Sequence, residues 1–395
     1  MSRDPSPIPA STPHRPLSLY EILAIVLLWN AGYKGARVAN TLYALELGAG
    51  PLDTGLLLAT YGFFPLLLAV FIGKIADRYG VRVPIIAGTI VSVLGTALPW
   101  AFPVLPMLFV SAAVCGAGFI LTQLSMQSLV GSLGSGADRT RNLNLYALVV
   151  STSDLLGPIV AGFSIDHIGY VSTYAVLAAP GVVAVLVVIF MFNRLSHAAG
   201  HSDRSGQRMA DLLRIGHLRR MFLTSALVMT GLDLFQLYLP LHGHSIGLSA
   251  SAIGMVLGAF AAAGFVTRAL LPVMARRFGE ERTLCYSMYL AACTFFMIPL
   301  FDNAIVLGAV CFVLGLGMGL GQPLTVILTY NYAPPGRHGE GLGLRIAINN
   351  SMHVAVPAVF GAIGTLFGLA PVFWLSSAIL ALGGYTGPMR RPVPA

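Results

Sequence analysis

Apolar runs of about 20 residues recur along almost the whole chain, and short polar segments separate them. A helical run of this length matches the hydrocarbon thickness of a bilayer. The segments between the runs are too short to hold a soluble domain of ordinary size. Because 56% of the 395 residues are hydrophobic and only 10% are charged, a soluble core cannot cover the apolar side chains. The sequence therefore predicts an all-α integral membrane protein.

Hydropathy predicts twelve transmembrane helices. The predicted spans are residues 19–45, 52–73, 83–102, 104–131, 142–165, 172–192, 220–242, 250–275, 283–301, 304–331, 344–366 and 370–388. An even number of spans places both termini on the same side of the membrane. The lipid bilayer is thus the expected surrounding of most of the chain.

Basic residues are confined to one side of this predicted topology. If the N-terminus is cytoplasmic, every Lys and Arg except Lys34 and Arg37 falls in an inner segment or near an inner helix end, Arg268 and Arg345 included. This positive-inside bias predicts two cytoplasmic termini in a multi-pass protein of the cytoplasmic (inner) membrane. It also explains the net charge of +8, so we expect no nucleic-acid partner.

The longest polar stretch, residues 193–218, divides the predicted spans into two sets of six. A constant shift of 199 residues aligns the sets, for example Gly162 with Gly361 and Gly169 with Gly368. Parallel repeats of this kind hold a solute site near the membrane midplane, between the two halves. The predicted segments are a disordered cytoplasmic tail (1–18), an N-terminal six-helix bundle (19–192), a cytoplasmic central loop (193–218), a C-terminal six-helix bundle (219–388) and a cytoplasmic tail (389–395).

The segment between the second and third spans resembles the GxxxDRxGxR signature of the major facilitator superfamily. The matching residues are Gly73, Asp77, Arg78, Gly80 and Arg82. This resemblance implies a secondary transporter rather than an enzyme, with twelve helices in two six-helix repeats around a central cavity. It also implies that the segment acts as a latch between the halves on the cytoplasmic face.

A second segment in the fifth span is similar to the GxxxGPxxGG motif of the antiporters in that superfamily. Gly157, Pro158 and Gly162 match the motif, whereas Ser153 and Ala161 depart from it. Small residues and a proline also favour close helix packing in any multi-span protein. The motif therefore leaves two interpretations open, an antiporter signature and a general helix-packing site.

Four ionisable side chains lie near the middle of predicted spans: Lys34, Arg37, Asp154 and Asp233. A charge at this depth costs about 2.5 to 3.5 kcal/mol on the insertion scale, so such groups are either functional or paired. One interpretation is a set of permanent ion pairs that hold helices together. The other is that one or both carboxylates take up a proton during transport.

Further polar residues share faces of the predicted helices with these charges. The shift of 199 residues places Lys34 on Asp233 and Asp154 on His353, so the two halves carry complementary chemistry at equivalent positions. The predicted substrate and proton pathway comprises Asn30, Lys34, Arg37, Gln123, Gln127, Asp154, Asp233, Gln236, Gln322, Asn349, Asn350 and His353.

The leading hypothesis is proton-coupled export of a small organic solute by alternating access. The sequence holds no GxxxxGK[ST] loop, so the proton gradient is the expected energy source, and we expect a monomer with no cofactor and no metal site. Proton-coupled uptake of an organic anion is an alternative, motivated by Lys34 and Arg37. A membrane receptor or enzyme without transport activity is an alternative from another class.

Overall fold

The computed structural model describes residues 18–79, 81–133, 136–190, 209–334 and 337–386. Nearly all of these residues are helical. The elements are α1 (Leu19–Glu46), α2 (Pro51–Tyr79), α3 (Arg82–Ala101), α4 (Leu105–Ser132), α5 (Gly136–Phe190), η2 (Met209–Arg214), α6 (Gly216–Ser245), α7 (Ala250–Phe278), α8 (Glu280–Met297), η3 (Ile298–Leu300), α9 (Ala304–Tyr332), α10 (His338–Phe367) and α11 (Leu369–Thr386). The predicted tails and most of the predicted central loop lie outside the described residues.

Short polar residues define where several helices begin. Ser18 and Glu21 form a capping box at α1, because each side chain accepts a hydrogen bond from the backbone N–H of the other residue. The Ser249 hydroxyl accepts from Ala252 N at the start of α7, and Asn303 caps α9. These side chains bind backbone N–H groups that have no partner within the helix.

Glycines with positive φ make the chain reversals, and they repeat through the two halves. Gly48 and Gly247 follow α1 and α6 with φ of 85° and 76°. Gly169 interrupts the 55 residues of α5 with φ of 80°, and Gly368 ends α10 with φ of 83°. The members of each pair are 199 residues apart, so the internal repeat extends to backbone conformations that other residues rarely adopt.

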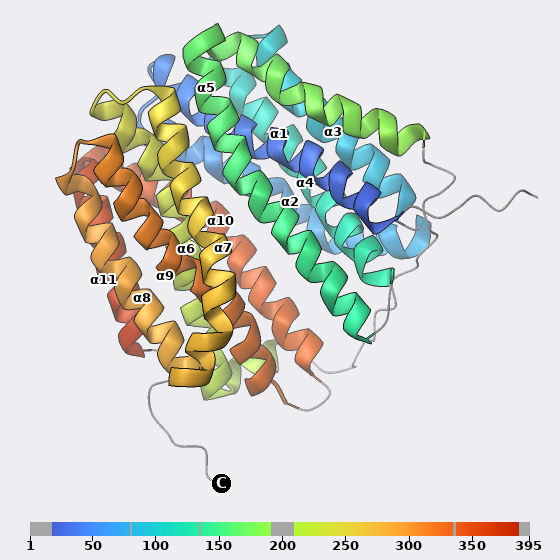
Figure 1. Ribbon diagram of the computed structural model, residues 1–395, viewed down its shortest axis with the longest axis vertical. Coiled ribbons are helices and arrows are strands. Elements are labelled where there is room, and N and C mark those ends of the chain that lie inside the picture. Colours follow the sequence, from blue (N-terminus) through green and yellow to red (C-terminus); the bar gives the residue numbers. More distant parts are fainter. Residues whose placement is uncertain (1–17, 80, 134–135, 191–208, 335–336, 387–395) are drawn as a thin grey trace, which may run out of the picture.

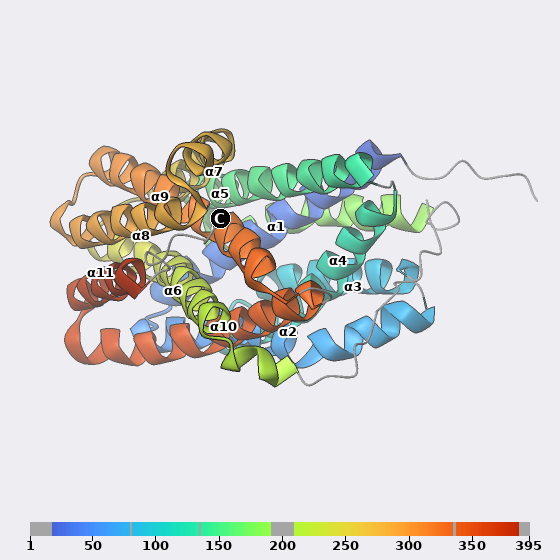
Figure 2. The same cartoon turned by 90° about the horizontal axis from the view of Figure 1, so that it is seen from below.

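The helices form two bundles that lie side by side (Figures 1 and 2). In the first bundle α1 packs on α5 and α3 on α4, and in the second α9 packs on both α7 and α8 while α11 packs on α8. The main contacts between the bundles are those of α2 with α10 and of α5 with α7. Two helix pairs therefore hold the bundles together.

The bundles meet at one end of the molecule and diverge toward the other, as the course of α5 and α7 in Figure 1 shows. At the end where they meet, a methyl group on Gly254 would overlap the carbonyl oxygen of Pro158, and one on Gly55 would overlap that of Pro357. We call the end with these two crossings the closed end. The opposite end, where α5 begins and α7 ends, we call the open end.

Eight stretches of the described residues are long and apolar enough to cross a membrane. One of them, Arg141–Phe190, contains the break at Gly169, and Leu369–Tyr385 forms a shorter apolar helix. Helix α1 is not among the eight, because Lys34 and Arg37 lower the hydropathy of its centre. The multi-span architecture agrees with the sequence, while the count of twelve spans stays a prediction.

Candidate functional site

A cavity of about 1070 Å³ lies between the bundles, within the range of small-molecule sites. Its wall runs from Leu58, Pro158 and Leu257 near the closed end to Arg141 and Leu271 near the open end. Six of the residues that the sequence singles out lie on this wall: Lys34, Arg37, Asp154, Pro158, Gln236 and Gln322.

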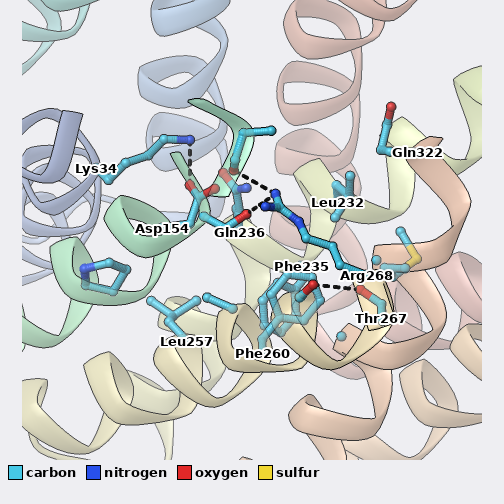
Figure 3. Close-up of a pocket in the computed structure, with 18 of the residues that line it drawn as sticks. Lys34, Asp154, Leu232, Phe235, Gln236, Leu257, Phe260, Thr267, Arg268 and Gln322 are labelled. Atoms are coloured by element: carbon cyan, nitrogen blue, oxygen red, sulfur yellow. Dashed lines mark hydrogen bonds and ion pairs between the residues drawn. The ribbon is translucent and has the colours of Figure 1, made fainter. Parts of the chain in front are cut away.

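The first ion pair of the site joins two helices of the first bundle. Lys34 Nζ on α1 lies 2.7 Å from Asp154 Oδ1 on α5, and both side chains face the cavity (Figure 3). Their side chains are 21% and 40% exposed, so water reaches both charges. Such a pair can exchange one partner for a charged ligand without leaving a dry, uncompensated charge.

The second cluster is centred on Asp233 of α6, which is only 1% exposed. His353 Nδ1 on α10 lies 2.8 Å from Asp233 Oδ1, and Arg37 Nη2 of the other bundle lies 4.0 Å from the same oxygen. Asp233 Oδ2 is buried and has no hydrogen-bond partner. Asp233 is thus a buried carboxylate at the seam between the bundles, with a cation on either side.

The two clusters occupy equivalent positions in the internal repeat. Lys34 and Asp233 are 199 residues apart, and so are Asp154 and His353. Each bundle therefore holds one pair between equivalent helices, but the carboxylate lies on α5 in the first bundle and on α6 in the second. This reversed arrangement places opposite charges across the seam, where Arg37 approaches Asp233.

Other predicted pathway residues lie away from the cavity wall. Asn30 is fully buried, and its amide has no hydrogen-bond partner among the described residues. Gln123 is partly buried with its Oε1 unpaired, Gln127 is exposed, and Asn350 is half-buried. Helix α4 packs mainly on α3 and α2, which explains why Gln123 and Gln127 do not reach the cavity.

The predicted latch motif lies at the open end. Gly73, Asp77 and Arg78 belong to the last turns of α2, and Arg82 is the first residue of α3. Gly80 lies outside the described residues. The position between two helices at the open end agrees with the sequence analysis, and the latch function stays a prediction.

The helix-packing motif of α5 contacts two neighbours. A Cβ at Gly157 would lie 2.7 Å from Lys34 Cβ, so this glycine brings α5 close to α1 beside the ion pair. Pro158 and Gly162 face α7, where they contact Gly254 and Ala250. The motif therefore forms the crossing of α5 and α7 at the closed end.

Arg268 of α7 is a cavity residue that the sequence analysis assigned only to the positive-inside bias. Its Nη2 donates to the Ala147 carbonyl oxygen at 2.7 Å and to Ser151 Oγ at 2.6 Å, both on α5 of the other bundle. Figure 3 shows its guanidinium directed toward the Lys34–Asp154 pair. A cation at this helical position, two turns before the end of α7, was the signal that could have identified it.

Arg345 of α10 was also explained by topology, but it is buried and 8% exposed. Its Nη1 donates to Ser225 Oγ at 3.1 Å and, at 3.4 Å, to Gln322 Oε1 and Thr325 Oγ1. Asn349 Oδ1 accepts from the same Ser225 hydroxyl. All these partners are neutral, so Arg345 keeps its positive charge behind the cavity residue Gln322.

Comparison with known proteins agrees with this architecture. The chain is 24% identical to the tetracycline resistance protein, class G, of Vibrio anguillarum, over 83% of this chain and 85% of that protein. It is 22% identical to multidrug resistance protein 1 of Bacillus subtilis, over 86% and 87% of the two chains. The quinolone resistance protein NorA of Staphylococcus aureus is 21% identical, over 86% and 88%.

Solved structures share the fold at low sequence identity. The nucleoside transporter NupG superposes with a TM-score of 0.74 at 12% identity, over 93% of this chain and 98% of that one. A variant of the peptide transporter POT gives 0.75 at 16% identity, over 93% and 92%. The sequence model described as Major Facilitator Superfamily matches residues 22–357. The chain belongs to the major facilitator superfamily, whose members are transporters.

Proposed function

We propose that the protein is a proton-coupled antiporter that exports a small organic solute by alternating access. Membership of a transporter superfamily supports the class, and relatives named for resistance to tetracycline, multiple drugs and quinolones support export. The proposal includes twelve spans in two repeats, a monomer in the inner membrane and two cytoplasmic termini. The open end then faces the cytoplasm.

Asp233 is the observation that carries the coupling. This buried carboxylate lies between His353 and Arg37, and Arg37 belongs to the other bundle. Protonation would remove the charge of Asp233 and with it the attraction across the seam. A proton on this carboxylate can therefore change how strongly the two bundles attract each other, as coupling requires.

Alternating access follows from the two crossings at the closed end. In the opposite state α5 would separate from α7, and α2 from α10, while the open end would close around the Gly73–Arg82 segment. Asp154 and Lys34 would then face the other side of the membrane. The solute would exchange places with the proton within the same cavity.

Flux into proteoliposomes under an imposed pH gradient tests the proposal, with tetracycline and a quinolone as first probes because relatives are named for them. We expect Asp233→Asn to lower gradient-driven flux at least about tenfold, since an amide carries no proton in exchange. The control is Asp302→Asn, an exposed carboxylate outside the cavity. If Asp154→Asn and Asp233→Asn both leave gradient-driven flux intact, the carboxylate mechanism is wrong.

Proton-coupled uptake of an organic anion is the second candidate, and the cations on the cavity wall favour it. The same flux experiment separates the two directions. Export requires that solute and protons move in opposite directions, whereas uptake requires that they enter together.

A further inference from the structure

The charges on the cavity wall are strongly unequal. The described wall residues include four cations, Lys34, Arg37, Arg141 and Arg268, and one carboxylate, Asp154. Asp233 lies behind the wall and compensates part of the charge of Arg37. The wall is therefore positive overall, and a cleft lined by one sign of charge concentrates ligands of the opposite sign.

Arg268 differs from the other three cations in its partners. Lys34 pairs with Asp154, Arg37 approaches Asp233, and Arg141 lies 3.7 Å from Asp138. In the part of the chain that the structure describes, no carboxylate forms an ion pair with Arg268. Its guanidinium binds only a carbonyl and a hydroxyl of α5, which are neutral acceptors that an anionic group can replace with a net gain.

Arg345 adds to this positive field from behind the wall. It is buried among neutral partners, and one of them, Gln322, faces the cavity. Buried charges are weakly screened, so the charge of Arg345 acts on the cavity interior. Two guanidinium groups without a described carboxylate partner thus belong to one side of the cavity, that of the second bundle.

The rest of the wall is apolar and partly aromatic. The rings of Phe235 and Phe260 stack with centroids 4.2 Å apart, and Leu232 and Leu257 continue this surface (Figure 3). Flat apolar groups bind such surfaces by hydrophobic and ring contacts. The cavity therefore offers a cationic side and an aromatic side to one ligand.

We infer that the transported solute is an amphipathic organic anion, whose acidic group binds Arg268 while its aromatic or aliphatic body packs on Phe235 and Phe260. This inference rests on the proposed transport function and specifies its substrate class. The Arg268 guanidinium would exchange the Ser151 hydroxyl for the acidic group of the solute. Arg345 would strengthen binding through its field and not through contact.

Calorimetric titration of the purified full-length protein tests the inference with three probes that share one ring system: naphthoate, naphthamide and naphthylmethylammonium. We expect naphthoate to bind at least about tenfold more tightly than the other two, because only it forms a charge-assisted hydrogen bond with Arg268. Arg268→Gln should lose this preference. Arg268→Lys should keep most of it, since it retains the charge.

The matched control is Arg276→Gln, which removes an exposed arginine from the same helix, and it should leave the affinity for naphthoate unchanged. Equal or weaker binding of naphthoate than of the amide overturns the inference, and so does an unchanged preference in Arg268→Gln. Binding does not depend on proton coupling. Coupled flux without anion preference therefore refutes only the substrate class, whereas anion preference without coupled flux refutes only the proposed export.

Discussion

The two equivalent ion pairs differ in their contact with water. Asp154 is 40% exposed to the cavity, whereas Asp233 is 1% exposed. An exposed pair contributes little to stability, because water already solvates both charges. A buried carboxylate that loses its partner keeps the full cost of its desolvation. The same position in the repeat therefore has a different energetic role in each bundle.

Removing the cation of each pair should reveal this difference. We expect His353→Leu to lower the free energy of unfolding by about 3 kcal/mol, because it leaves Asp233 with only Arg37 at 4.0 Å. Lys34→Met should lower it by about 1 kcal/mol or less. Thermal unfolding in detergent measures both. Adding Asp233→Asn to His353→Leu should recover most of the loss, and equal losses in the two single variants would contradict the argument.

At the scale of helices, two crossings related by the repeat hold the closed end together. Gly254 of α7 contacts Pro158 and Gly162 of α5, and the positions 199 residues away make the same contacts between α2 and α10. Each glycine meets backbone atoms, which cannot move aside as a flexible side chain can. Close approach of the bundles therefore depends on the absence of a Cβ at these positions.

Gly254→Ala should weaken the closed end, because its methyl group would overlap the Pro158 carbonyl. Spin labels at Leu47 and Ser245, which are exposed and lie on different bundles, should then show a longer distance in a Cys293→Ser background.

The control makes the same change on the same helix. Gly264→Ala introduces a methyl group with nothing within 4 Å, so the distance should stay that of the parent chain. An unchanged distance in Gly254→Ala would show that the crossing tolerates a Cβ and does not hold the end closed.

For the whole molecule, the sequence predicts what depends on spacing. The shift of 199 residues relates Lys34 to Asp233 and Asp154 to His353, and the structure pairs these residues within each bundle accordingly. The same shift relates the positive-φ glycines at the chain reversals. Spacing along a helix determines which residues share a face, so a repeated pattern carries over to repeated contacts.

The sequence does not predict which polar face meets the cavity. Gln127 was placed on the pathway by its polarity, but its face of α4 is exposed. Arg268 and Arg345 were explained by their depth near one side of the membrane, yet both contribute to the site or its surroundings. Hydropathy reports depth along the membrane normal. The direction of a side chain around its helix depends on how the bundles pack, which one sequence does not contain.

The bundles are also joined by helix caps that cross between them at the closed end. Asp166 of the first bundle accepts hydrogen bonds from the N–H groups of Ala250 and Ser251, at 3.1 and 2.8 Å, at the start of α7. At the equivalent place Thr365 Oγ1 accepts from Leu52 N of α2 at 3.1 Å. Both caps must break when the closed end opens. Only the first is a carboxylate, which also interacts favourably with the positive end of the helix dipole.

Asp166→Asn should therefore shift the whole molecule toward the opposite state. Losing a charged cap costs about 1 kcal/mol, which changes the ratio of the two states about fivefold. Labels at Leu47 and Ser245 should move apart, while labels at Arg139 and Arg277, exposed near the open end, should approach each other. Asp53→Asn is the control, because Asp53 caps Gly50 of its own helix and not the other bundle. Movement at one end alone would refute rigid rocking of the two bundles, since rigid bodies that separate at one end must close at the other.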